Sequence, residues 1–80
     1  MTEGRKIRVI AYSGYKGEES PRSFFLDEVK VEVASIIRSW VEEPLQGGGR
    51  RRFFKVRGGD GFTYTLYYNE VQSEWFLAAE

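Results

Sequence analysis

The chain has 80 residues, of which 41% are hydrophobic and 16% aromatic, which is enough apolar surface for one compact core and too much for a disordered chain. Lys and Arg number 12, as do Asp and Glu, so the net charge is zero and lacks the basic excess typical of nucleic-acid-binding proteins. Histidine and cysteine are absent, which excludes disulfides, thiolate and imidazole metal sites, and the usual Ser or Cys triads.

Residues 5–12 form the first predicted strand. Ile7, Val9 and Ala11 fall on one face of an extended chain. Residues 13–22, SGYKGEESPR, are rich in turn-forming residues and end this strand. The apolar stretch within residues 5–12 is far shorter than the span of about 20 residues that crosses a membrane. A length of 80 residues predicts one domain, 1–80, and because cysteine is also absent, we expect a reducing cytoplasm.

Residues 27–43 fit either a helix or a strand. Their apolar residues recur at spacings of three and four, as on one face of a helix. The alternation of Val29, Val31 and Val33 with charged residues instead favours a strand. The strand alternative requires a β-bulge near residues 34–35, so that the later apolar residues reach the inner face.

The C-terminal third has the clearest pattern. After a loop at residues 44–49, PLQGGG, residues 51–57 and 62–68 alternate apolar and polar side chains on either side of the glycine-rich turn 58–61. Glycine supplies the positive φ angles that such turns need. Together with a short strand at residues 74–77, these segments predict a three-stranded antiparallel meander.

The chain resembles a group of small bacterial proteins of unknown function. The resemblance covers residues 17–77 and rests on YSGYKGEESPRSFF, VKVEVASIIRSW and RFFKVRGGDGFTYTLYYNEVQSEWFL. In that group a G-x-x-x-P-x-x-F segment precedes a short turn, an R-W strand end and a closing Y-x-L-x-Y…W-x-L. The resemblance implies a hairpin and a long strand over residues 24–40, and a nucleic-acid context, since some relatives occur beside DNA-repair polymerase-like proteins. The turn in FFLDEVKV is more acidic than its counterparts in the group.

We therefore predict an all-β fold of five to six strands, either a small SH3-like barrel or a strongly bent antiparallel sheet. The alternative is an α+β fold, with a helix at residues 27–43 on a four-stranded sheet. The predicted core consists of Ile7, Val9, Val31, Val33, Ile36, Phe54, Val56, Tyr64, Leu66, Trp75 and Leu77.

The sequence offers little for catalysis or metal binding. Adjacent carboxylates at 18–19, 27–28 and 42–43 would point to opposite faces of a strand, so they do not converge. Segment 58–61 lacks the Lys and Ser or Thr of a phosphate loop and has only one carboxylate for a cation. We therefore predict that the protein is not an enzyme and has no cofactor and no bound metal.

Residues 50–57, RRRFFKVR, combine five basic residues with two phenylalanines. If Phe54 points inward, Phe53, Lys55 and Arg57 share the outer face, beside hydroxyl and aromatic side chains of the next strand. Cations and aromatic rings on one face suit the backbone and bases of a nucleic acid. The candidate binding surface is Arg50, Arg51, Arg52, Phe53, Lys55, Arg57 and Tyr67.

A second interpretation of this surface is that its cations pair with acids of the same chain, such as Glu32, Glu42 or Glu74.

Trp40 and Trp75 each end an apolar run, and we expect both in the core or at its rim. The alternative is that one of them stacks on a ligand.

Because the net charge is zero, we expect a binding or accessory module with a protein partner or a structural role. The alternative is weak, sequence-tolerant binding of single-stranded nucleic acid through the candidate surface. We expect no membrane contact, and a monomer or weak homodimer, since an exposed sheet edge invites pairing.

Overall fold

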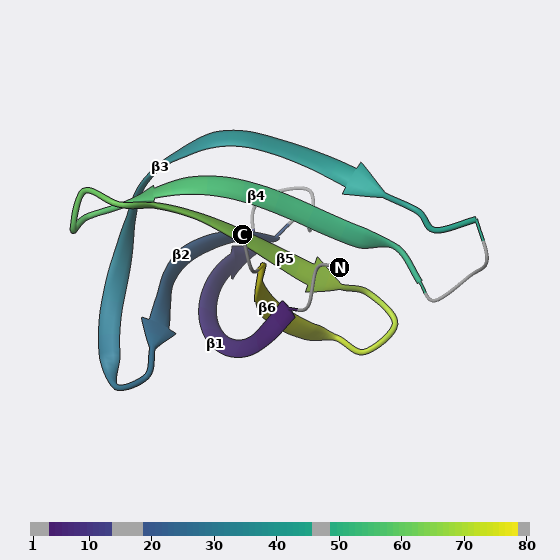
Figure 1. Ribbon diagram of the computed structural model, residues 1–80, viewed down its shortest axis with the longest axis horizontal. Coiled ribbons are helices and arrows are strands. Elements are labelled where there is room, and N and C mark those ends of the chain that lie inside the picture. Colours follow the sequence, from purple (N-terminus) through teal and green to yellow (C-terminus); the bar gives the residue numbers. More distant parts are fainter. Residues whose placement is uncertain (1–3, 14–18, 46–48, 79–80) are drawn as a thin grey trace.

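The computed structural model describes residues 4–13, 19–45 and 49–78, which contain six strands and no helix (Figure 1). Each strand is antiparallel to the next, and β6 pairs with β1, so the sheet closes into a barrel. The predicted all-β barrel is confirmed, and the α+β alternative with a helix at residues 27–43 is wrong. The strands are β1 (Gly4–Ser13), β2 (Glu19–Leu26), β3 (Val29–Glu42), β4 (Arg51–Gly58), β5 (Thr63–Asn69) and β6 (Glu74–Ala78).

β3 occupies the segment whose sequence fitted both a helix and a strand. It forms a hairpin with β2 in which Leu26 lies opposite Val29, which leaves a two-residue loop. Asp27 in that loop has a φ of 55°, a left-handed conformation that Asp tolerates better than most residues. The register with β4 shifts between Val33 and Ser35, which confirms the predicted bulge, and shifts again between Ile36 and Arg38. The β-branched residues and the tight hairpin therefore prevail over the helical spacing.

The barrel is filled mainly by aromatic and aliphatic side chains from β2 to β6. Its buried residues are Phe24, Val31, Phe54, Val56, Leu66 and Trp75. Most of the predicted core is confirmed, because the other predicted members except Ile36 are partly buried against this cluster. Ile36 is 43% exposed, and the prediction that it belongs to the core is wrong. Phe24, which is fully buried, was missing from the predicted core.

Ile36 is exposed because β2 and β3 separate along their length. Their ladder ends where Ser23 lies opposite Glu32, whereas β3 stays paired with β4 as far as Glu42. The earlier part of β2 pairs only with β1, and it contains Pro21, which has no N–H to donate to a ladder. No described strand pairs with the edge of β3 that faces away from β4 after Glu32 (Figure 1).

Asp60 fixes the turn between β4 and β5. Its carboxylate accepts hydrogen bonds from the Phe62 amide at 3.0 Å and from the Tyr64 hydroxyl at 2.6 Å. The Gly58 amide donates to the Phe62 carbonyl at 2.8 Å, which closes the turn. The Tyr64 hydrogen bond and then the Phe62 amide hold the pKa of Asp60 below its ordinary value of 3.8, and the same contact with Asp60 raises the pKa of Tyr64.

We expect the stabilising effect of Asp60 to depend on pH. Because its folded-state pKa is lowered, its contribution to stability is complete above the unfolded pKa and is lost as the pH falls through the folded pKa. Asp60→Asn should therefore lower the urea midpoint at pH 7, and the difference from the wild type should shrink as the pH falls below about 4. Tyr64→Phe removes the donor and should give a similar pattern. Equal midpoints at pH 7, or a difference that is constant with pH, would contradict this role.

Candidate functional site

Four aromatic rings form a row across the outer face of the barrel, one from each of the strands β3 to β6. In the strand register Trp40 lies opposite Phe53, Phe53 opposite Tyr67, and Tyr67 opposite Phe76. Successive ring centroids are 5.2, 4.9 and 5.1 Å apart, with interplanar angles of 9°, 29° and 17°. We call Trp40, Phe53, Tyr67 and Phe76 the aromatic row. Stacked pairs of this kind stabilise a sheet through cross-strand contacts.

The stacking leaves the two central rings unavailable to a ligand. Phe53 and Tyr67 are only 7% and 9% exposed although they lie on the outer face, because each has a ring on both sides. The hypothesis that either of them stacks on a base therefore loses its support, since a base needs a free ring face.

Trp40 ends the row at the edge of β3 that has no strand partner. It is half-buried, and among the described rings only Phe53 stacks on it. Its indole Nε1 donates a hydrogen bond to the Glu42 carboxylate at 3.0 Å, and the Arg38 guanidinium carbon lies 5.2 Å from its ring centre. A second exposed ring, Phe62, is 67% exposed beside the β4–β5 turn. Trp40 and Phe62 therefore provide more accessible aromatic surface than the centre of the row.

Four cations surround the aromatic row without an acidic partner. Arg51, Lys55 and Arg57 alternate along β4 on the same face as Phe53, and Arg38 on β3 lies directly opposite Lys55. No carboxylate among the described residues lies within 4 Å of any of these cations, although Glu42 is opposite Arg51 in the register. We call Arg38, Arg51, Lys55 and Arg57 the basic group.

Two features of the basic group cost stability when nothing is bound. Arg38 and Lys55 are like charges directly opposite each other on neighbouring strands, an arrangement that is destabilising. The Arg51 guanidinium lies 5.8 Å from the centre of the Tyr67 ring, and its Nε is buried without a hydrogen-bond partner in the described part of the chain. An anion on this face would relieve the charge repulsion.

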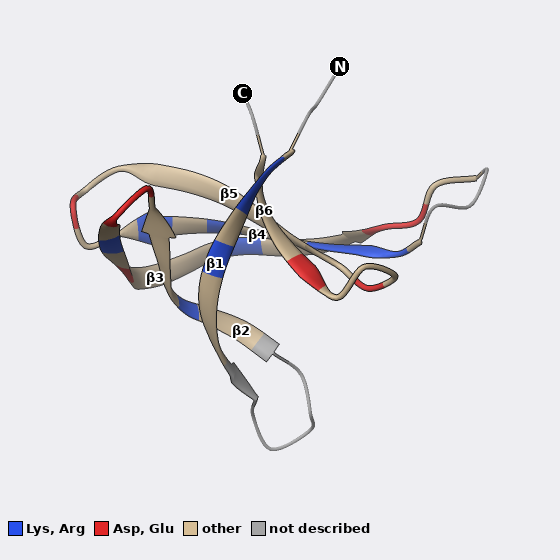
Figure 2. Ribbon diagram, turned by 90° about the horizontal axis from the view of Figure 1, so that it is seen from below, with Lys and Arg blue, Asp and Glu red and all other residues tan. Residues whose placement is uncertain are grey.

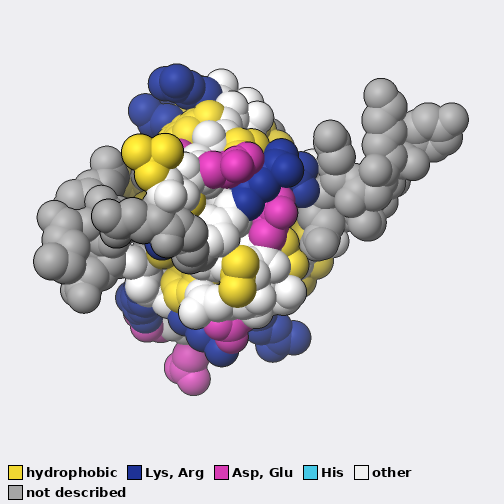
Figure 3. Space-filling view, turned by 90° about the vertical axis from the view of Figure 1, so that its right-hand side faces the viewer, with side chains coloured by type: hydrophobic (Ala, Val, Ile, Leu, Met, Phe, Trp, Pro, Cys, Tyr) yellow, Lys and Arg dark blue, Asp and Glu magenta, His cyan; other side chains and the backbone are white. Residues whose placement is uncertain are grey.

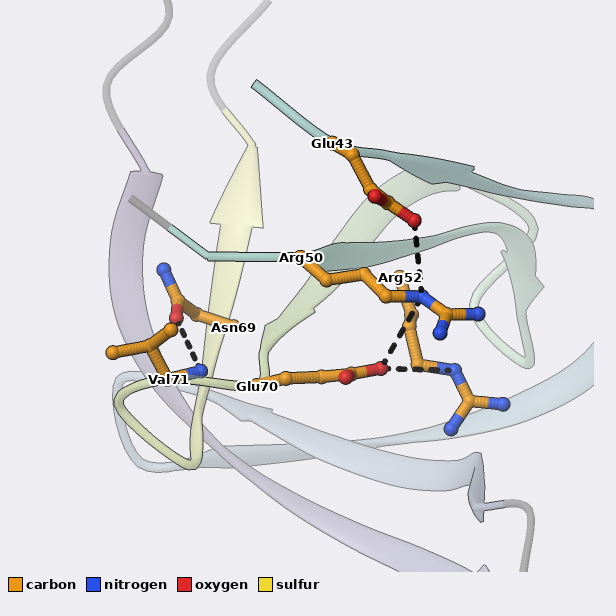
Figure 4. Close-up of polar contacts among 6 residues, drawn as sticks. All are labelled: Glu43, Arg50, Arg52, Asn69, Glu70 and Val71. Carbon is orange, nitrogen blue, oxygen red and sulfur yellow. Dashed lines mark hydrogen bonds and ion pairs between the residues drawn. The ribbon is translucent and has the colours of Figure 1, made fainter. Parts of the chain in front are cut away.

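Arg50 and Arg52, which the sequence placed on the candidate surface, are instead engaged in an ion-pair cluster (Figure 4). The Nε atoms of Arg50 and Arg52 lie 3.8 and 3.9 Å from a Glu70 carboxylate oxygen, and Arg50 Nε lies 3.9 Å from Glu43. The turn that carries Glu70 is fixed by Asn69, whose side-chain oxygen accepts hydrogen bonds from two backbone amides, those of Val71 and Gln72. These two arginines are therefore at least partly neutralised.

The acids proposed from the sequence as partners of the basic strand are occupied elsewhere. Glu74 pairs with Lys6, Glu32 pairs with Lys30, and the carboxylate of Glu42 accepts from Trp40. In Figure 2 the acidic residues lie mainly at turns and strand ends, whereas Lys and Arg recur along β1 and β4. In the view of Figure 3, acidic side chains lie directly beside basic ones near the centre of the molecule. A second patch of Lys and Arg side chains, at the top of this view, has no acidic side chain beside it.

The structure thus brings together five of the seven residues predicted for the candidate surface, namely Arg51, Phe53, Lys55, Arg57 and Tyr67. Arg38 and Phe76 also belong to this face and were not predicted. The alternation around Trp75 and Leu77 was sufficient to place Phe76 outward. The side of the sheet on which Arg38 lies was not predictable, because the second bulge in β3, between Ile36 and Arg38, reverses the alternation of inward and outward side chains.

The described residues contain no group of three or more carboxylates placed to hold a metal ion. No helix among them is long and apolar enough to cross a membrane. A scan against protein-family models, a search of curated proteins and a search of solved structures found no match to this chain.

Proposed function

We propose that this protein is a binding module whose outer face binds single-stranded nucleic acid weakly and with little sequence preference. The main supporting observation is the basic group of four cations, which surrounds the aromatic row and has no carboxylate partner among the described residues. A surface that combines cations with accessible rings can contact phosphates and bases at the same time.

The net charge of zero does not oppose this proposal. Charges farther apart than about 8 Å are largely screened at physiological ionic strength, so the local charge decides what a small face attracts. Among the other described cations, five are paired with described carboxylates, namely Arg5, Lys6, Lys30, Arg50 and Arg52. Arg8 lies over the Phe25 ring, and Arg22 has contacts of its own. The basic group is therefore a concentration of positive charge within a neutral molecule.

The residues of the face have distinct roles in this proposal. Lys55 and Arg57 are two residues apart on one strand, which separates their Cα atoms by about 6.6 Å and lets them contact different phosphates. Thr63 and Thr65 lie opposite Arg57 and Lys55, where their hydroxyls can donate to phosphate oxygens. Trp40 supplies a ring at the end of the row for a base to stack on.

An acidic protein segment is the alternative ligand for the same cations, and it corresponds to the protein partner expected from the sequence. The partly exposed ring of Trp40 favours nucleic acid, because every base has a flat face that stacks on an aromatic ring. Single strands are favoured over duplexes because their bases are free to leave the stack.

We also propose that the protein is not an enzyme, that it is cytoplasmic, and that it belongs to a bacterial family with a nucleic-acid context. The lack of histidine and cysteine supports a role other than catalysis. The lack of cysteine supports a cytoplasmic location. The resemblance in sequence motifs supports a bacterial family with a nucleic-acid context.

The proposal is tested by titrating the protein with a fluorescent single-stranded oligonucleotide at two salt concentrations. Four phosphate contacts predict a slope of log K against log salt of about −2.8, which is a loss of affinity of about 50-fold between about 50 mM and about 200 mM salt. An acidic peptide of equal charge and a duplex should bind more weakly at every salt concentration. The proposal fails if the oligonucleotide does not bind at about 50 mM salt, or if the acidic peptide binds more tightly.

A further inference from the structure

The edge of β3 that faces away from β4 is a long, exposed sheet edge. β3 is paired with β4 as far as Glu42, but its ladder with β2 ends at Glu32, which leaves backbone N–H and C=O groups without a strand partner among the described residues. Ile37 and Val41 on this stretch are 48% and 45% exposed. An edge of this kind is a template for another strand.

We propose that this edge pairs with the same edge of a second copy of the chain, antiparallel and centred on Trp40. A two-fold axis at Trp40 places Arg38 of each copy opposite Glu42 of the other, so the register forms two opposite-charge pairs. It also places the two Trp40 side chains opposite each other, so in the dimer Arg38 and Trp40 are engaged by the other copy, and only the monomer offers these two residues to a nucleic acid. This inference does not depend on nucleic-acid binding.

Charge selects this register over its neighbours. An axis at Arg38 would place two arginines opposite each other, and an axis at Glu42 would place two carboxylates there, both of which are destabilising. An axis at Ser39 leaves the Glu42 carboxylate opposite Ile36, without a cation. A shift that pairs outer-face with inner-face residues is excluded by the alternation of the strand.

The second bulge in β3 limits the length of the pairing. The register shift between Ile36 and Arg38 twists the edge just before the proposed contact, so the paired segment is residues 38–42. Such a short segment makes a small interface, and we expect a weak dimer with a Kd between about 1 μM and about 1 mM. Charged residues commonly block sheet edges, but here their order makes antiparallel self-pairing complementary.

Analytical ultracentrifugation of the protein without nucleic acid tests the inference through a charge swap. The wild type should shift from monomer to dimer with rising concentration. Arg38→Glu and Glu42→Arg each place like charges opposite each other twice and should weaken the dimer by at least about tenfold. The double variant restores two opposite-charge pairs and should recover the dimer. Arg5→Glu, on β1 and away from this edge, makes the same change of charge as Arg38→Glu and is the control, which should leave the dimer unchanged.

The circular dichroism spectrum of each variant must match that of the wild type, so that a lost dimer is not mistaken for lost folding. A wild type that stays monomeric up to about 1 mM would overturn the inference. So would a dimer that both single variants leave intact, or one that the double variant does not recover. Because the readout is mass alone, its failure leaves the proposed nucleic-acid binding untouched.

Discussion

Replacing Leu66 by alanine should lower the free energy of unfolding by about 2 to 5 kcal/mol. Leu66 is fully buried in the middle of β5, within the core that all the strands close around. Removal of its side chain loses buried apolar surface and leaves a cavity, since a closed barrel has little freedom to collapse. A small domain has a total stability of only about 5 to 15 kcal/mol, so the variant should be largely unfolded at 37 °C if the wild type is near the lower limit.

Leu45→Ala is the matched control for this variant, because Leu45 is fully exposed beyond the end of β3. Chemical denaturation followed by circular dichroism should show a large shift for Leu66→Ala and none beyond about 0.5 kcal/mol for Leu45→Ala. Similar shifts for the two variants would mean that the barrel interior does not hold the fold together.

The second large effect concerns the basic group. Lys55→Ala combined with Arg57→Ala should weaken oligonucleotide binding and reduce the salt slope from about 2.8 to about 1.4, since each lost phosphate contact removes about 0.7. Between about 50 mM and about 200 mM salt, the affinity of the variant should then fall by only about 7-fold, in place of about 50-fold. The measurement is the same fluorescence titration.

The control for this pair is Arg5→Ala combined with Lys30→Ala, which changes the net charge by the same amount. Arg5 and Lys30 lie on β1 and β3 and are paired with Asp27 and Glu32. If binding depended on net charge alone, both double variants would lose the same affinity and slope. We expect the control to keep a slope near that of the wild type, because its two cations lie outside the basic group.

The fold was predictable from local patterns that each strand carries in its own sequence. β4 and β5 alternate apolar and polar residues around a glycine-rich turn, which specifies a hairpin without any distant contact. β3 was harder, because its apolar residues fit both a helix and a strand, and the resemblance decided between the two. Ile36 was placed in the core incorrectly because the separation of β2 from β3 is a tertiary feature that no local pattern contains.

The candidate site was predictable in part. Alternation placed Phe53, Lys55 and Arg57 on one face, as the structure has them. It could not show that Arg50 and Arg52 pair with Glu70, because that carboxylate is brought near them by the turn after β5. Nor could it show that ring stacking buries Phe53, since burial on the outer face depends on neighbours from three different strands.

The most direct test of the proposed binding face uses the two tryptophans of the chain. Trp40 lies on the outer face at the end of the aromatic row, whereas Trp75 is buried in the core. In an NMR titration with a single-stranded oligonucleotide at about 50 mM salt, the indole N–H resonance of Trp40 and the amides of Lys55 and Arg57 should shift, while the indole resonance of Trp75 stays in place. Shifts confined to the Arg50–Glu70 cluster, or no shift of the Trp40 resonance at saturation, would contradict the assignment of this face.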